Sequence, residues 1–157
     1  MRLTFKQRAM TLLSKYDIYD SDGNTVFVVE GQFSFGAKLI VTDADGYPLG
    51  RVEKQLMRWR SHFDFYVNDQ LAGTMRREFS PFHPTYTLDF NGWQVEGNFT
   101  GRDYRIVDAN GYPVASVHKE LMHWTDTYII DVEDPANAMF CLMIVLSIDV
   151  EKAQSQS

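Results

Sequence analysis

The sequence DADGYP at residues 43–48 returns as DANGYP at residues 108–113, 65 positions later. The same offset aligns 11 identical residues among the 25 positions that run from 43 to 67 and from 108 to 132. In both copies a glycine follows Asp or Asn, and this pair is typical of tight β-hairpins because glycine adopts positive φ at little cost. We therefore interpret the chain as two copies of one β-rich unit, at about residues 16–69 and 86–134.

Alternating apolar and polar residues flank these turns, as at residues 63–67 and 128–132, and indicate half-buried strands. Asp-Gly and Asn-Gly pairs at residues 22–23 and 91–92 bring the expected tight hairpins to four. From about residue 16 to residue 132 the pattern predicts eleven or twelve short strands, joined mostly by antiparallel turns. For the first fifteen residues an edge strand and a short helix both fit.

The C-terminal segment departs from this pattern and predicts a helix over residues 135–149. Asp134 is a good N-cap, and Pro135 suits the first helical turn, where its missing N–H costs nothing. Apolar side chains then cover every side of residues 138–148, so no polar face is left for water. The helix must be enclosed. The alternative is a buried strand at residues 140–147.

A barrel of about twelve strands has an interior that its own side chains do not fill, and the apolar helix can occupy it. The expected fold is mainly β: a closed antiparallel barrel of about twelve strands, built from two similar halves around a central hydrophobic C-terminal helix. We expect a single domain over residues 1–152, with residues 153–157 as a disordered tail.

The duplicated hairpins, the K-x-L-M-x-W segments at residues 54–59 and 119–124, and the apolar helix entered through residues 133–135 resemble the LURP-one-related family. That family is similar to the C-terminal domain of Tubby and to phospholipid scramblases. The resemblance covers about residues 3–152 and implies a closed barrel of about twelve strands around a central hydrophobic helix. It further implies phosphoinositide binding for Tubby and a membrane role for scramblases, but no lipid-binding residue of Tubby could be matched to a position here.

Composition and charge narrow the class of function. The 157 residues are 45% hydrophobic and 14% aromatic, which is typical of a globular domain, and a net charge of −6 argues against nucleic-acid binding. The single cysteine, Cys141, allows no internal disulfide and fits a reducing compartment, so we expect a cytoplasmic protein. The apolar run at residues 138–148 is about half of the roughly 20 residues that a membrane-spanning helix needs.

The sequence contains no motif that predicts catalysis or a bound cofactor. The four histidines lack metal-ligand spacing, and no G-x-S-x-G, P-loop or dinucleotide-binding motif occurs. Cys141 is a poor nucleophile because burial in an apolar helix raises a thiol's pKa. We therefore expect a protein that is not an enzyme, with no cofactor and no metal site.

One basic cluster remains as a candidate binding site. Arg51, Lys54, Arg58 and Arg60 surround Trp59, whereas the second copy has Ser, Lys, His and Thr at the positions matching the four cations. Arginines beside tryptophan can bind phosphates at a membrane interface. The competing interpretation is a solvated strand face with a tryptophan kept for packing, since Trp recurs at residue 124.

Two hypotheses of function follow. The first is a non-enzymatic binding module that recognises anionic phospholipid and lies peripherally at the inner membrane surface. The second is a structural or protein-interaction domain that acts through its acidic second half or by self-association. The second half is acidic because residues 103–157 carry 3 basic and 9 acidic side chains, against 12 of each in residues 1–102.

Overall fold

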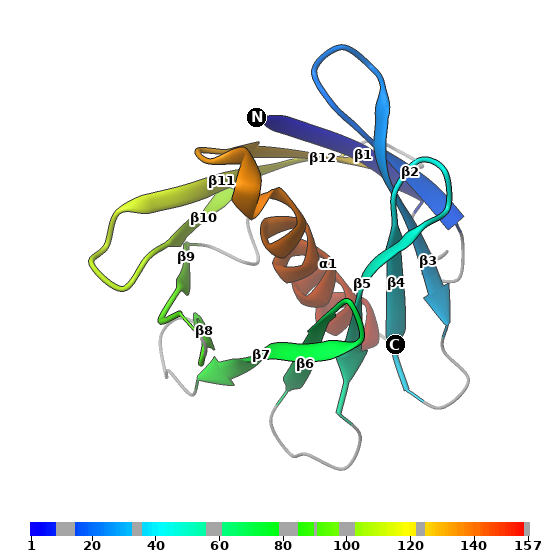
Figure 1. Ribbon diagram of the computed structural model, residues 1–157. Coiled ribbons are helices and arrows are strands. Elements are labelled where there is room, and N and C mark those ends of the chain that lie inside the picture. The colour runs from blue at the N-terminus through cyan, green and yellow to red at the C-terminus, as the bar shows by residue number, and fades with distance from the viewer. Residues whose placement is uncertain are drawn as a thin grey trace.

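A computed structural model of the chain describes residues 1–8, 15–32, 36–55, 61–78, 85–89, 91–97, 103–121 and 125–155. Twelve antiparallel strands close into a barrel, in which β12 pairs with β1. Figure 1 shows the strands surrounding helix α1 (Ala138–Ser155), so the predicted fold class is confirmed. The strands are β1 (Arg2–Arg8), β2 (Lys15–Tyr19), β3 (Thr25–Gln32), β4 (Lys38–Thr42), β5 (Pro48–Lys54), β6 (His62–Val67), β7 (Gln70–Glu78), β8 (Thr85–Leu88), β9 (Gln94–Gly97), β10 (Asp103–Val107), β11 (Pro113–Leu121) and β12 (Thr125–Val132).

The duplicated turn has the same hydrogen bonds in both copies. Oδ1 of Asp43 accepts the backbone N–H groups two and four residues later, both at 2.9 Å, and Oδ1 of Asp108 accepts the equivalent groups at 2.8 and 2.9 Å. Gly46 and Gly111 have φ values of +89° and +84°. Asp20 closes the β2–β3 turn in the same way, with both distances at 2.9 Å. The aspartates therefore fix the turns, and the glycines supply the left-handed backbone that these turns require.

We predict that Gly46→Val and Gly111→Val each lower the free energy of unfolding by about 1–3 kcal/mol. A Cβ at either position would meet nothing within 4 Å, so the cost is the strain of a β-branched residue at positive φ. Urea unfolding of the two variants measures it, and the two should behave alike. A valine variant that unfolds at the wild-type midpoint would contradict the turn conformation.

Two elements were not specified by the sequence patterns. The β6–β7 turn contains no glycine, and Asn68 and Asp69 themselves adopt φ values of 51° and 62°. Asn and Asp tolerate this region better than other residues with side chains. The first residues form strand β1, which pairs with β12 from Arg2 to Arg8 and closes the barrel. Of the two possibilities for this segment, the strand is correct, and it is not at an edge.

The C-terminal helix begins as predicted and ends later than predicted. Oδ1 of Asp134 accepts the N–H of Ala136 at 3.0 Å, and the short 3₁₀ helix η1 (Pro135–Asn137) leads into α1. Helix α1 continues to Ser155, past the expected end at residue 149, and takes in residues 153–155 of the expected tail. The alternative of a strand at residues 140–147 is wrong.

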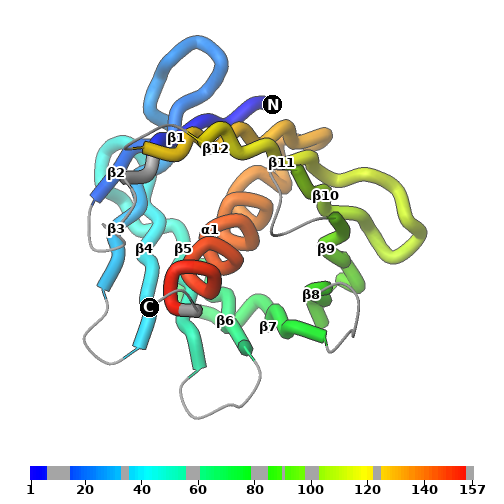
Figure 2. The backbone as a smooth tube through the Cα atoms, turned by 180° about the vertical axis from the view of Figure 1, so that it is seen from behind, coloured from blue at the N-terminus to red at the C-terminus, as the bar shows by residue number. Residues whose placement is uncertain are grey.

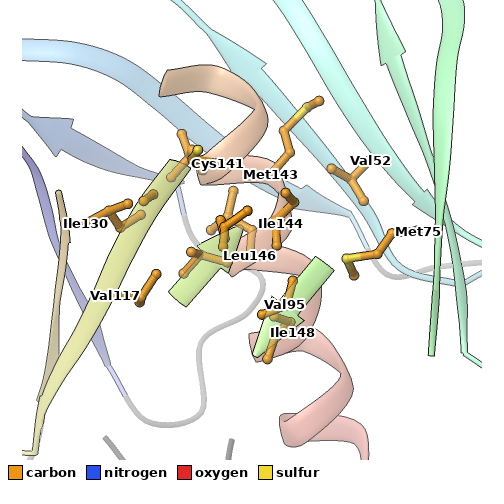
Figure 3. Close-up of a cluster of buried hydrophobic side chains, with 14 of the residues drawn as sticks. Val52, Met75, Val95, Val117, Ile130, Cys141, Met143, Ile144, Leu146 and Ile148 are labelled. Carbon is orange, nitrogen blue, oxygen red and sulfur yellow. The ribbon is translucent and has the colours of Figure 1, made fainter. Parts of the chain in front are cut away.

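Helix α1 fills the barrel, and side chains 141–148 are buried on every side of it. Figure 3 shows Cys141, Met143, Ile144, Leu146 and Ile148 among side chains of the barrel wall. The wall residues labelled there come from five strands: Val52, Met75, Val95, Val117 and Ile130. The hydroxyl of Ser147, the only polar side chain in this stretch of α1, donates to the Met143 carbonyl at 2.7 Å. The core is therefore a helix packed inside a barrel, and the buried hydroxyl of Ser147 has a hydrogen-bond partner within the helix.

The two ends of the barrel differ. At one end short turns connect the even-numbered strands to the next strand, and α1 enters there after β12; we call it the turn end. At the other end the odd-numbered strands and α1 finish; we call it the loop end. Figure 2 shows α1 crossing the barrel between them. The segments that connect strands at the loop end lie largely outside the described residues.

Candidate binding surface at the loop end

The predicted basic cluster is divided by the fold. Arg51 and Lys54 lie three residues apart on β5, so their side chains leave opposite faces of the sheet. Arg51 lies on the outer face, and Lys54 lies at the loop end beside α1. The other three members, Arg58, Trp59 and Arg60, are outside the described residues.

Arg51 is neutralised by its neighbours. Its guanidinium lies 3.1 Å from Oε1 of Glu53 and 2.5 Å from Oδ1 of Asp69, and it covers the ring of Tyr66 at 3.9 Å. It lines an outer groove of about 440 Å³ together with Lys38, which faces Glu53 at 3.8 Å. Since two carboxylates already satisfy this guanidinium, Arg51 is poorly suited to bind a further anion.

Lys54 and its counterpart Lys119 hold the end of α1 from two sides of the barrel. The Lys54 ammonium donates to the side-chain carbonyl of Gln154. Lys119 lies 3.9 Å from Oδ1 of Asp149 and 3.0 Å from Oδ2 of Asp126. The repeat therefore places one lysine of each copy against the last turns of the helix, where a cation also interacts favourably with the helix dipole.

Carboxylates on α1 form a second feature of the loop end. Glu151 is only 6% exposed, and its two oxygens accept the Tyr86 hydroxyl at 2.5 Å and the Arg77 guanidinium at 2.8 Å. Asp149 accepts the hydroxyl of Tyr128. Burial raises the pKa of the Tyr86 and Tyr128 phenols, and the adjacent carboxylates raise it further. These phenols therefore stay protonated and act as donors that fix the helix end to the wall.

These carboxylate contacts were not predicted from the sequence. Arg77 and Tyr86 lie 74 and 65 residues before Glu151, and only closure of the barrel brings them together. The available signal was the presence of Asp149 and Glu151 directly after the apolar run at residues 138–148, which must be enclosed. Carboxylates in such a position require partners from the surrounding strands.

The fold also sorts charge along the barrel axis. The turns at the turn end, including residues 133–134 before α1, contain no Lys or Arg. They carry nine carboxylates: Asp20, Asp22, Asp43, Asp45, Asp69, Asp89, Asp108, Glu133 and Asp134. At the loop end basic side chains, interleaved with carboxylates, lie within two residues of where their strand begins or ends, or, for Lys152, within three residues of the end of α1. With described side chains these are Lys6, Lys15, Lys38, Lys54, Arg76, Arg77, Arg105, Lys119 and Lys152. The two halves of the sequence differ in charge, but in space the difference lies between the two ends of the barrel.

The single cysteine thiol is buried inside the barrel. Burial raises the pKa of the Cys141 thiol to about 12, so it stays a neutral apolar group. Among the described residues, no three His, Cys, Asp or Glu side chains come together as a metal site. No described helix combines the length and the hydropathy needed to cross a membrane.

Comparison with known proteins places this barrel in a family. The model of the LURP-one-related family matches residues 1–149. The chain belongs to the LURP-one-related family. This LURP-one-related protein is 23% identical over 151 residues to the uncharacterized protein YxjI of Bacillus subtilis (strain 168), covering 96% of this chain and 93% of YxjI.

The LURP-one-related fold also appears among solved structures. An Arabidopsis thaliana protein solved by X-ray crystallography superimposes with a TM-score of 0.62 at 17% identity, covering 96% of this chain and 91% of that one. At this identity the similarity concerns the fold alone. Family membership and the barrel together indicate a ligand-binding or scaffold domain.

Proposed function

We propose that this LURP-one-related protein is a non-enzymatic domain that docks on anionic phospholipid through the loop end of its barrel. It would then act peripherally at the inner face of a cytoplasmic membrane. The observation that carries the proposal is the separation of charge along the barrel axis. A molecule whose turns at one end carry only carboxylates, and whose Lys and Arg side chains gather among carboxylates at the other end, approaches an anionic membrane in one preferred orientation.

The segments that connect strands at the loop end support this orientation by their composition. They are residues 9–14, 33–35, 56–60, 79–84, 98–102 and 122–124, and they contain three arginines and no Asp or Glu. Their aromatic residues are Phe33, Phe35, Trp59, Phe79, Phe82, Phe99 and Trp124. Arginine binds lipid phosphates, and tryptophan partitions into the headgroup region. This combination suits a membrane surface better than a small soluble anion.

We predict that the double variant Arg58→Glu/Arg60→Glu binds vesicles of 30% phosphatidylserine in phosphatidylcholine at least about 30-fold more weakly than wild type. Each cation near an anionic membrane contributes about 1 kcal/mol, and the reversal replaces that attraction with repulsion. Co-sedimentation at low salt and at about 0.15 M salt measures the loss, and wild-type binding should weaken with salt because the Debye length falls to about 8 Å.

A matched control is Arg2→Glu, since the Arg2 side chain is 53% exposed and begins β1 at the turn end. Substitutions at His123 and Thr125, the second-copy positions matching Arg58 and Arg60, should also do much less. Wild-type protein that ignores anionic vesicles at low salt, or equal losses in all these variants, would overturn the membrane proposal. Sedimentation of the same samples as concentration-dependent dimers without lipid would then favour self-association.

A further inference from the structure

The seam between β1 and β2 is the weakest joint among the described strands of the barrel wall. β1 pairs with β12 through seven register pairs, and β2 pairs with β3 through five. Between β1 and β2 a single pair is formed, Thr4 with Tyr19, near the turn end. Figure 1 shows these two strands crossing at an angle. Beyond Thr4 and Tyr19 the two strands therefore lack a ladder of backbone hydrogen bonds as they run toward the loop end.

A groove of about 610 Å³ occupies this seam. Its lining comes from β1, β2 and β12: Thr4, Phe5, Lys6, Lys15, Tyr16, Asp17, Tyr19, Thr127 and Ile129. The floor is aromatic, since the ring of Phe5 stacks on Tyr16 at 5.7 Å and on Tyr128 at 4.7 Å. These rings close the barrel interior beneath the groove, so the seam is open outside and packed within.

The backbone groups along the seam, which lack a cross-strand ladder, are suited to bind an extended polypeptide. Backbone N–H and C=O groups of adjacent strands normally satisfy one another, and strand edges that do not are templates for an added strand. In such β-strand addition the main chain supplies the hydrogen bonds, and alternate side chains enter the available pockets. Here one face of the added strand would meet Phe5 and Tyr16, and the other would lie beside the lysines at the rim.

The charged side chains beside the groove indicate which residues the bound strand would carry. Lys6 and Lys15 are exposed on opposite sides of the groove, and neither forms an ion pair with any described residue. The one carboxylate in the lining, Asp17, accepts a hydrogen bond from the Thr25 hydroxyl at 3.3 Å. Two cations without carboxylate partners favour acidic residues in the occupant.

We propose that the β1–β2 seam binds an extended acidic segment of a partner protein by β-strand addition, with apolar residues directed inward and acidic residues toward Lys6 and Lys15. This proposal does not depend on the membrane proposal, although Lys6 and Lys15 also belong to the basic side chains of the loop end. A domain that uses both would recruit its partner to a membrane, because the seam lies in the barrel wall and the lipid-facing surface lies at its loop end.

The probe is a fluorescein-labelled peptide of alternating Glu and Val, eight residues long, titrated with the full chain and followed by fluorescence anisotropy. We expect saturable binding, at least tenfold weaker binding of a Ser-Val peptide, and at least a tenfold loss in the Lys6→Glu/Lys15→Glu variant. The control is Lys38→Glu, which reverses a basic residue at the same end of the barrel but outside the groove. It should bind the peptide as wild type does.

Hydrogen exchange gives a readout that charge attraction alone would not produce. Binding of the Glu-Val peptide should slow amide exchange in residues 5–6 and 16–18, and the rest of the barrel should not change. No saturable binding, no protection of these amides, or an equal loss in Lys38→Glu would overturn the proposal. If the Lys6→Glu/Lys15→Glu variant loses vesicle binding while the wild type ignores the peptide, the seam serves lipid and the peptide proposal is wrong.

Discussion

Leu142→Asp is expected to leave no cooperatively folded protein. Leu142 is fully buried in α1, where an ionised carboxylate would lose its hydration and a neutral one would still lack a partner. The lost apolar contacts add about 2–5 kcal/mol, against a total stability of about 5–15 kcal/mol for a typical domain. Circular dichroism during heating measures the outcome. Leu142→Met should retain a cooperative transition, and Leu71→Asp, at a position 58% exposed on β7, should change stability by less than about 0.5 kcal/mol.

Removal of residues 134–157 tests the same central helix without introducing a charge. The shortened chain would leave the wall facing an empty interior, since residues 141–148 are all buried against it. Each large apolar side chain contributes about 1.5–3 kcal/mol on burial, so the loss exceeds the stability of an ordinary domain. We expect residues 1–133 to aggregate. A soluble fragment that melts cooperatively would show that α1 is not the core.

The features predictable from sequence are those set by local chemistry. The Asp and Gly residues of the duplicated turn and the N-cap at Asp134 act on backbone groups within four residues of themselves, so a short window of sequence contains their partners. The apolar circumference of α1 is also local, and it implied enclosure before any strand was located. These local patterns were sufficient to predict the barrel, its hairpins and the central helix.

The candidate site was less predictable because its contacts are long-range. Glu151 meets partners from β7 and β8, and Lys54 meets Gln154 a hundred residues later. The separation of Arg51 from Lys54 was nevertheless readable, because an odd spacing on one strand places two side chains on opposite faces. The predicted basic cluster did not take into account that side chains alternate between the two faces of β5. The distribution of charge along the barrel axis follows from the antiparallel strand order, because this order places every short acidic turn at the same end of the barrel.

Among valine substitutions at Gly23, Gly46, Gly92, Gly97 and Gly111, all at positive φ, Gly97→Val is expected to be the most damaging, lowering the free energy of unfolding by about 2–6 kcal/mol. Gly97 has φ +131° at the end of β9, opposite Tyr104 of β10. A Cβ there would lie 2.8 Å from the Tyr104 Cα and 3.1 Å from the Asp103 carbonyl oxygen, so the obstacle is backbone. Gly46→Val is the matched control, because it carries the backbone strain without the contact.

The difference between the two valine variants isolates the close approach of β9 and β10. Urea unfolding midpoints should fall further for Gly97→Val than for Gly46→Val, and Gly97→Ala should already show part of the difference, since its Cβ alone makes the contact. Equal losses for the two valines would mean that the strands separate at little cost. Sequence comparison within the chain aligns Glu30-Gly31 with Glu96-Gly97, but Gly31 is not among the positive-φ glycines. The strained conformation therefore belongs to the second copy alone, and the two halves of the barrel have diverged in backbone as well as in charge.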